Sequence, residues 1–237
     1  MAKTNIVILT GAGISAESGL QTFRAEDGLW NNYAVEEVAT PEAFFEDPEL
    51  VQSFYNMRRK ELQATSPNAA HKALYILEQN WEGNFLLITQ NIDDLHERAG
   101  SQSPLHMHGE LLKARCANTE TVYDWHDDIN ESSRCECCNE FGTLRPHIVW
   151  FGEMPLKMEH IASALQNCDI FLSIGTSGNV YPAAGFVQEA IESGCSYTAE
   201  VNLEETEGAE IFDEGIYGLA TEELPKLVER LLKGQLS

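Results

Sequence analysis

An apolar, β-branched run from Ile6 to Thr10 leads directly into a glycine-containing turn. Gly11 and Gly13 permit backbone torsions and a close approach that a Cβ atom would prevent. The free N–H groups at the start of a following helix offer partial positive charge to a phosphate. A strand, a glycine turn and a helix in this order indicate a parallel α/β sheet that binds a dinucleotide at a strand end. An ordinary turn is the alternative interpretation.

The acidic residues after this turn argue against one class of dinucleotide enzyme. A hydride-transferring domain has an acidic residue at the end of its second strand, about 20 residues after the glycine turn, where it binds ribose. Glu26 and Asp27 instead fall in a polar loop. The sequence therefore disfavours a standard dehydrogenase.

Strand and helix signals alternate along the chain, which predicts an α/β fold, a Rossmann-like parallel sheet with helices on both faces. The later strands are expected at 85–89, 148–152, 169–174 and 196–201, and the helices at 48–62, 68–80, 156–167, 182–193 and 221–232. The 237 residues are read as a single domain. Its Rossmann-like parts are 1–35, 68–113 and 145–237, with a helical insertion at 36–67 and a small cysteine-containing, zinc-ribbon-like insertion at 114–144.

The charge of the chain limits its partners. With 15 basic and 38 acidic residues the net charge is -23, which disfavours nucleic acid and favours basic partners such as lysine-rich protein segments. No apolar run approaches the roughly 20 residues that span a bilayer, and no export leader is evident. We therefore expect a cytoplasmic protein that does not bind membranes. A monomer is compatible with the sequence, which does not determine the oligomeric state.

Polar side chains follow the strand expected at 85–89. Gln90, Asn91 and Asp93 lie where open α/β sheets bind their ligands, although a turn made of Asn and Asp is the alternative. His106 and His108 follow a second short apolar stretch, and either could act as a base near neutral pH. We expect at most one of these two histidines to face the site.

The helix predicted after Asp47 carries an arginine on its apolar face. Helical spacing places Arg58 in line with Tyr55, and an inward arginine needs an anion. The alternative is that Arg58 extends to the rim of the core or pairs with a structural carboxylate. Arg59 and Lys60 are expected on the solvent side, and His71, at the start of the next helix, is expected at the surface or as a capping residue.

Four of the six cysteines crowd into one short region, which in a cytosolic protein indicates a metal rather than disulfides. Cys135 and Cys138 form one Cys-x-x-Cys pair, whereas Cys116 has no such partner. These three thiolates are the predicted zinc ligands, with water, His126 or Cys137 as the fourth. A metal-free loop is the alternative.

Seven short motifs occur in the order found in sirtuins, the NAD-dependent protein lysine deacylases, and together they cover nearly the whole chain. They are residues 11–15, 22–24, 90–93, 106–109, 151–153, 175–177 and 202–204. Tyr55, Arg58 and residues 149–152 resemble the class III branch, which includes bacterial sirtuins of the CobB type. Only the cysteine pattern departs from the common form of the family.

The resemblance implies NAD as a co-substrate and an acylated lysine in a protein or peptide as the substrate. Residues implied to bind NAD are Gly11, Ala12, Gly13, Ser15, Phe23, Arg24, Trp30, Gln90, Asn91, Asp93, Gly175, Thr176, Ser177, Asn202, Leu203, Glu204 and Ala220. Residues implied to bind the acylated substrate are Tyr55, Arg58, Val149, Phe151, Gly152 and Glu153. The peptide backbone is expected to add as a strand between 151–153 and 178–180.

The resemblance also implies a reaction. The acyl oxygen attacks the ribose, nicotinamide leaves, and His108 acts as general base on a ribose hydroxyl, with Asn91 as a second catalytic residue. The products are lysine, nicotinamide and an O-acyl-ADP-ribose, and the removed groups are acetyl, succinyl and malonyl. Tyr55 and Arg58 hold the carboxylate of a succinyl or malonyl group. Transfer of ADP-ribose to protein and a non-enzymatic NAD-binding module are the competing interpretations.

Overall fold

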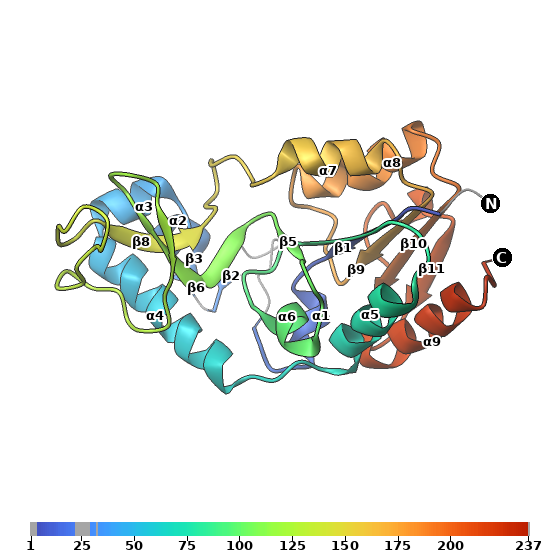
Figure 1. Cartoon of the computed structure of the whole chain (residues 1–237), viewed down its shortest axis with the longest axis horizontal. Coiled ribbons are helices and arrows are strands. Elements are labelled where there is room, and N and C mark those ends of the chain that lie inside the picture. Colours follow the sequence, from blue (N-terminus) through green and yellow to red (C-terminus); the bar gives the residue numbers. More distant parts are fainter. Residues whose placement is uncertain (1–3, 22–28, 32, 237) are drawn as a thin grey trace.

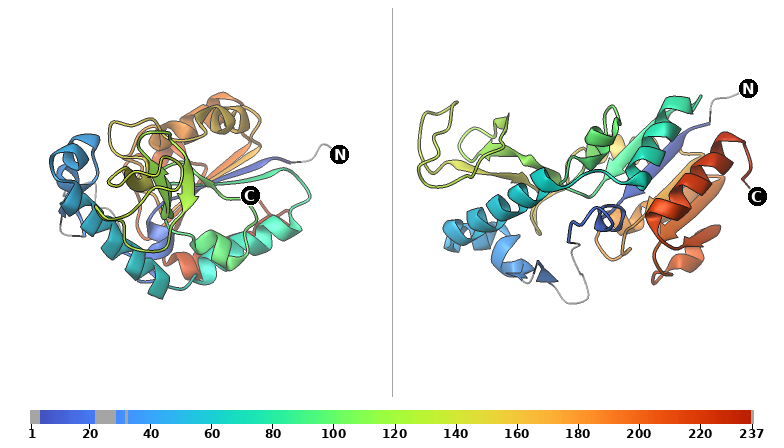
Figure 2. Two further views of the ribbon diagram at one scale, coloured as in Figure 1. Left: turned by 60° about the vertical axis from the view of Figure 1, so that its left-hand side comes forward. Right: turned by 90° about the horizontal axis from the view of Figure 1, so that it is seen from below.

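The computed structural model describes residues 4–21, 29–31 and 33–236, and it has two parts. A six-stranded sheet with helices on both faces forms one end of the molecule, and a smaller part with its own three-stranded sheet forms the other (Figure 1). The views in Figure 2 show helix α4 (Pro48–Ala64) running alongside the smaller sheet. The α/β class predicted from the sequence is confirmed.

The larger sheet is parallel throughout, with the strand order β11-β10-β9-β1-β4-β5. Its strands are β1 (Ile6–Thr10), β4 (Phe85–Thr89), β5 (Leu105–His106), β9 (Ile170–Ile174), β10 (Tyr197–Asn202) and β11 (Glu214–Tyr217). Strand β1 pairs with β4 on one side and β9 on the other, so the strand order reverses next to it. Such a reversal leaves a crevice at the carboxyl ends of the strands, where ligands bind.

The central strands are buried on both faces of this sheet, which explains why their sequences are almost entirely apolar. Ile6 and Ile8 pack with helices α5 (Ala69–Asn80) and α9 (Ala220–Leu232). Val7 and Leu9 face the opposite layer, because successive side chains of a strand alternate. That layer contains α7 (Met158–Leu165), the short η1 (Ala183–Gly185) and α8 (Phe186–Glu192).

The smaller part combines three helices with two short antiparallel sheets. Its helices are α2 (Val35–Val38), α3 (Pro41–Glu46) and α4, and a hairpin of β2 (Leu29–Trp30) and β3 (Tyr33–Ala34) precedes them. The three-stranded sheet has the order β7-β6-β8, with β6 (Gly109–Cys116), β7 (Val122–Asp124) and β8 (Leu144–Ile148). Helix α4 begins after Asp47, as the sequence predicts, and the Asp47 side chain caps it by accepting a hydrogen bond from the Leu50 N–H.

Several expected segments differ from the observed ones. Residues 109–113 and 145–148, assigned from the sequence to the Rossmann-like part, belong to the smaller sheet. The strand expected at 148–152 is observed at 144–148 and ends at Ile148. Strand β11 was not predicted, because as an edge strand it is only half buried and has no apolar run. The remaining elements are α1 (Gly13–Ala16), α6 (Leu95–Ala99) and η2 (Ala209–Ile211). Within the described residues, no helix is long and apolar enough to cross a membrane.

The expectation that Arg59 is solvated is wrong. Its side chain is buried; Nε donates to the Leu111 carbonyl at 3.1 Å and Nη1 donates to Asn56 Oδ1 at 2.8 Å. Burial lowers the pKa of Arg59 to about 10. Strand β6 covers this side of α4, so a position opposite the main apolar stripe is also enclosed. Lys60 remains exposed, as expected.

Candidate functional site

A cavity of about 410 Å³ lies between the carboxyl ends of the large sheet and the smaller part. It brings together most of the site residues predicted from the sequence. Those that line it are Gly11, Ala12, Gly13, Ser15, Trp30, Tyr55, Arg58, Gln90, Asn91, Asp93, His108, Val149, Phe151, Gly152, Glu153, Gly175, Thr176, Ser177 and Asn202. Leu203, Glu204 and Ala220 are not among its lining residues, and Phe23 and Arg24 lie outside the described residues.

The glycine turn packs directly on the end of strand β9. A Cβ atom on Gly11 would lie 2.7 Å from the carbonyl oxygen of Gly175, and one on Gly13 would lie 2.7 Å from the Gly175 Cα. The Gly13 N–H donates to that same carbonyl at 2.8 Å, and Gly175 has a φ of +61°. Bare backbone therefore forms this wall of the cavity, which suits the close approach of a pyrophosphate.

Asn91 and Asp93, after β4, are joined to the first helix through Ser15. The Ser15 hydroxyl donates to Asp93 Oδ2 at 3.0 Å and accepts from Asn91 Nδ2 at 3.2 Å. The Leu95 N–H donates to Asp93 Oδ1 at 3.1 Å, and burial raises the pKa of this carboxyl. These bonds fix both side chains at the wall of the cavity before any ligand binds.

His71 supports this network from helix α5. Its Nε2 lies 3.3 Å from Ser15 Oγ, and its Nδ1 accepts from the Asn68 N–H at 3.3 Å, so the expected capping role is confirmed. The alternative of a surface position is wrong, because His71 is fully buried. Helix α5 turns its first residues toward α1, and this covers the imidazole.

Of His106 and His108, only His108 lines the cavity, as expected. Its Nδ1 lies 3.0 Å from the Gln90 carbonyl oxygen. A carbonyl only accepts, so Nδ1 carries a proton and Nε2 is the basic nitrogen. Burial lowers the pKa of His108, so the imidazole is neutral at neutral pH. A neutral imidazole at the cavity wall is suited to act as a general base.

Tyr55 and Arg58 extend from α4 into the same cavity. Arg58 is 6% exposed, and its guanidinium lies 5.5 Å from the centroid of the Trp30 ring. Nη1 donates to Glu61 Oε2 at 3.0 Å and Nη2 donates to the Gln21 carbonyl at 3.3 Å. Among the described residues, Arg58 Nε is buried without a hydrogen-bond partner. A buried cation with an unused donor offers a site for an additional anion.

The Arg58–Glu61 pair confirms the alternative in which Arg58 pairs with a structural carboxylate, while the binding of a substrate anion by Arg58 stays a prediction. Glu61 is the structural carboxylate that the sequence alternative anticipates, but it is 42% exposed and so only partly compensates the buried charge. Burial lowers the pKa of Arg58, while the Glu61 carboxylate opposes that shift. A second carboxylate inside the cavity would therefore be favoured.

Glu153, predicted to bind substrate, is held by other residues. Its carboxylate accepts two hydrogen bonds from Arg145, at 2.8 and 3.0 Å, and one from the Trp150 N–H at 2.8 Å. Burial acts to raise the pKa of Glu153, but the hydrogen bonds from Arg145 and Trp150 and the charges of Arg145 and Arg115 together outweigh it and lower the pKa. Glu153 therefore shapes the loop after β8, and its substrate role stays a prediction.

Three residues that contribute to the candidate sites were not assigned from the sequence. Trp150 lies in the cavity wall and bonds to Tyr55, although it stands within the motif at 149–152. Glu61 lies one turn after Arg58, a spacing that could have indicated the ion pair. Gln21 contributes only a backbone carbonyl, for which the side-chain pattern holds no signal.

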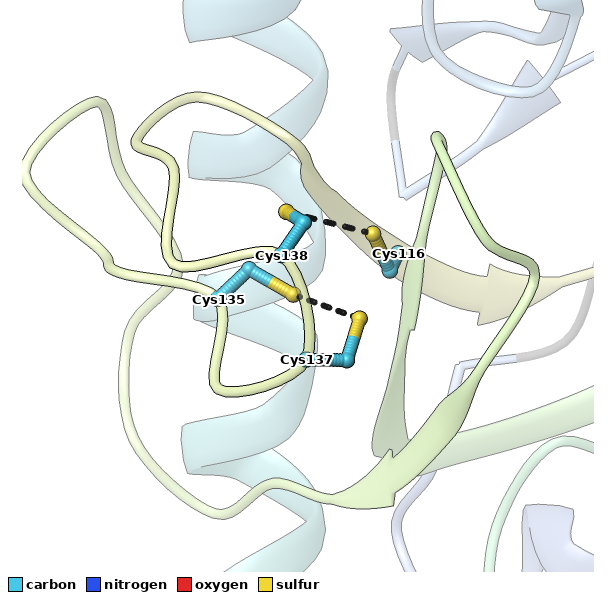
Figure 3. Close-up of side chains that lie close together, drawn as sticks. All are labelled: Cys116, Cys135, Cys137 and Cys138. Atoms are coloured by element: carbon cyan, nitrogen blue, oxygen red, sulfur yellow. Dashed lines mark hydrogen bonds between the residues drawn. The ribbon is translucent and has the colours of Figure 1, made fainter.

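The cysteine cluster includes four thiols, with Cys137 as the fourth (Figure 3). Their sulfur atoms all lie within 4.8 Å of one another; Cys116 and Cys138 are separated by 3.8 Å, and Cys135 and Cys137 by 3.3 Å. Ligands about 2.3 Å from a tetrahedral zinc ion lie about 3.8 Å apart, so the four thiols fit zinc. A hydrogen bond from Thr119 lowers the pKa of Cys116 to about 6, which favours the thiolate that a metal requires.

Comparison with known proteins agrees with this geometry. A profile of the Sir2 family matches residues 11–182. The NAD-dependent protein deacylase of Pasteurella multocida (strain Pm70) is 59% identical over 232 residues, which are 97% of this chain and 99% of that protein. The structure of a Sir2 homologue in complex with NAD superposes with a TM-score of 0.87 at 38% identity, covering 98% of this chain and 91% of the other. A Sir2 protein bound to acetylated peptide gives a TM-score of 0.79 at 29% identity, covering 98% and 94%.

Proposed function

Since this chain belongs to the Sir2 family, we propose that its NAD-dependent protein deacylase activity extends to acetyl, succinyl and malonyl groups on lysine side chains. The observation that carries the proposal is the position of Tyr55 and Arg58. Both line the cavity that also contains His108, Asn91 and Asp93. A carboxylate at the end of an acyl chain would meet a buried guanidinium and a phenol there.

Arg58 and Tyr55 have different roles in the proposed binding of the acyl group. Arg58 supplies a charge-assisted hydrogen bond, which is roughly twice as strong as one between neutral groups. Tyr55 supplies a hydroxyl, and burial raises its pKa, so the phenol stays protonated at neutral pH. An acetyl group has no carboxylate and leaves both donors unused. The pair therefore acts on the choice of acyl group and not on the bond-breaking step.

The residues near the glycine turn serve the NAD half of the reaction. NAD supplies the ribose to which the acyl group is transferred, and its nicotinamide is released. Gly11, Gly13 and Gly175 provide bare backbone for the pyrophosphate, while Asp93 faces the nicotinamide carboxamide. His108 accepts a proton from a ribose hydroxyl through Nε2, and the Gln90 carbonyl keeps the other ring nitrogen protonated.

We assign the protein substrate to the rim of the cavity. Phe151, Gly152 and Val180 line the cavity, and we assign an extended peptide to the space between 151–153 and 178–180, with its acyl-lysine directed inward. The net charge of -23 favours lysine-containing segments. A Sir2 protein bound to acetylated peptide supports this substrate class.

Two further assignments follow from the architecture. The six-stranded part binds NAD and the smaller part binds the acyl group, so that the whole chain is one catalytic unit with its cavity at the junction. The four thiols of Cys116, Cys135, Cys137 and Cys138 hold one structural zinc ion. Three sequence-predicted ligands are retained in this assignment, and Cys137 is favoured over water or His126 as the fourth.

The test uses two lysine peptides of one sequence, one acetylated and one succinylated, incubated with the protein with and without NAD and analysed by mass spectrometry. NAD-dependent loss of both groups with formation of the matching O-acyl-ADP-ribose is the expected result. Loss of acetyl alone would remove the proposed role of Tyr55 and Arg58. Release of nicotinamide with ADP-ribose on protein would indicate a transferase, and binding of NAD without turnover would indicate a binding module.

A further inference from the structure

A second cavity, of about 290 Å³, lies behind the loop that carries Asp93. Ile92 and Asp93 line both cavities, so this loop is the wall between them. The deacylase chemistry uses none of the other side chains in the second cavity. Its titratable and charged lining residues are Asp93, Asp94, Glu97, His106, Glu110, Lys113, Asp124 and His126.

Three of these side chains converge on one point. Glu97 comes from α6, His106 from the end of β5 and Glu110 from the start of β6. One ligand atom from each, a carboxylate oxygen or an imidazole nitrogen, lies within 4.8 Å of the other two. Residues from three separate elements thus present an imidazole and two carboxylates to the same space, and this set of donors binds divalent transition-metal ions.

The imidazole of His106 has the orientation that is common for a metal-bound histidine. Its Nδ1 lies 3.0 Å from the Asn91 carbonyl oxygen, which can only accept, so Nδ1 carries the proton. This contact directs Nε2 toward the carboxylates, and the second ring nitrogen of a metal-bound histidine commonly donates to a backbone carbonyl in this way. His106 is 9% exposed and cannot turn freely.

The separation of the donor atoms is also suitable. His106 Nε2 lies 2.8 Å from Glu97 Oε1. Two ligands about 2.1 Å from a metal ion and about 90° apart lie about 3 Å from each other. The pair can therefore bind one cation from adjacent corners of a coordination sphere, and the cavity leaves room for water at the remaining positions.

The charges around the cluster favour a cation. Five carboxyl groups line the cavity, and Lys113 is the one ammonium among the described lining residues. Lys113 Nζ lies 2.8 Å from Glu110 Oε2, but its side chain is 34% exposed and can move into solvent. Asp93 is engaged by Ser15 and Leu95, and Asp94 lies 3.5 Å from Arg98, so we do not count either carboxylate among the ligands of the cluster.

We propose that Glu97, His106 and Glu110 form a binding site for one divalent transition-metal ion, separate from the cysteine cluster and from the deacylase cavity. His106 binds through Nε2 and each glutamate through a carboxylate oxygen, and water completes the coordination. The two metal sites differ in chemistry: four thiolates select a soft or borderline ion such as zinc, whereas one nitrogen and two oxygens also accept manganese.

The test is a titration of the full-length protein, as purified with its zinc, with MnCl2 followed by electron paramagnetic resonance of free Mn²⁺. Thiolates do not compete for manganese, so the signal reports the second site. We expect one equivalent bound by the wild type and binding at least about tenfold weaker in Glu97→Gln, Glu110→Gln and His106→Gln. Mn²⁺ should also raise the unfolding midpoint of the wild type but not of these variants.

Matched controls distinguish Mn²⁺ binding at this site from Mn²⁺ binding to acidic residues elsewhere on the surface. His160→Gln and Glu229→Gln alter exposed residues outside the cavity and should bind Mn²⁺ as the wild type does. Glu97 and Glu110 are partly exposed, so their variants are expected to fold even where His106→Gln does not. Equal Mn²⁺ binding by the folded glutamate variants and the controls would overturn the proposal and leave His106 and Glu97 as a simple ion pair. So would the absence of a stoichiometric site in the wild type.

Discussion

The indole Nε1 of Trp150 donates a hydrogen bond of 3.0 Å to the phenolic oxygen of Tyr55, across 95 residues of sequence. Both side chains are buried, and the guanidinium of Arg145 lies 3.5 Å from the centroid of the Trp150 ring. Because the Tyr55 oxygen accepts from the indole, the phenol keeps its own proton for a substrate. The loop after β8 thus orients the side chain on α4 that we propose to determine acyl specificity.

Trp150→Phe is expected to lower the ratio of desuccinylation to deacetylation about fivefold, because one neutral hydrogen bond contributes about 1 kcal/mol. Kinetic constants for both acyl peptides measure this ratio. Tyr55→Phe should lower it similarly, and the double variant should lower it no further than Tyr55→Phe alone, since both changes act on one hydrogen-bond chain. Additive effects would show that Trp150 acts independently of Tyr55.

Arg58→Met is expected to lower kcat/KM for a succinylated peptide by about 10- to 100-fold, because a charge-assisted hydrogen bond contributes about 1.5–3 kcal/mol. Deacetylation should persist, since an acetyl group presents no carboxylate. Lys60→Met, on the exposed side of the same helix, is the control and should leave both activities unchanged. Equal loss of both activities in a folded Arg58→Met protein would argue against a role in specificity.

His108→Ala is expected to reduce the turnover of both acyl peptides by about 10²- to 10⁴-fold, the usual contribution of a general base. In the wild type, the acidic limb of the kcat/KM profile should fall below pH 6.5, the ordinary pKa of histidine, because burial lowers the pKa of His108. The base is active when unprotonated, so activity is retained into mildly acidic solution. An acidic limb above pH 6.5 would contradict the assignment.

Cys137→Ser is expected to weaken zinc binding, because it removes one of four thiolates. Zinc content after dialysis against increasing chelator measures the effect, and the variant should lose its metal at a chelator concentration at least about tenfold lower. Cys195→Ser alters a cysteine outside the cluster and is the control. If Cys137→Ser retained zinc as tightly as the wild type, the fourth ligand would be another group.

Burial lowers the pKa of His71 to about 4, and this predicts a pH-dependent stability. The unfolded state binds a proton near pH 6.5, while the folded state does so only near pH 4. This contribution to stability is therefore complete above pH 6.5 and declines as the pH falls toward 4, by about 2 kcal/mol between pH 7.5 and 5. Urea unfolding at both pH values measures it.

The change in the free energy of unfolding between pH 7.5 and pH 5 should be about 2 kcal/mol smaller in His71→Gln than in the wild type. His160→Gln, which alters an exposed histidine, should keep the pH dependence of the wild type. A His71→Gln protein with an unchanged pH dependence would show that other groups cause it.

The sequence alone was sufficient for the features that depend on near neighbours in the chain. The Ile6–Thr10 strand, the glycine turn, the start of α4 after Asp47 and the strand at 85–89 follow from periodicity and turn chemistry, which act over a few residues. Residues at the ends of β4, β9 and β10 that line the cavity were also correctly grouped, whereas Glu204 is not among the lining residues. The carboxyl ends of parallel strands meet at one edge, so strand assignment alone brings Asn91, Thr176 and Asn202 together.

Only the tertiary structure decided what depends on contacts between distant segments. Strand β6 buries Arg59, helix α1 covers His71, and the fold of residues 109–148 brings Cys137 to Cys116. The Trp150–Tyr55 bond and the convergence of Glu97, His106 and Glu110 have the same origin. Burial and pairing of a polar side chain depend on which element packs over it, and a local sequence pattern does not specify that neighbour.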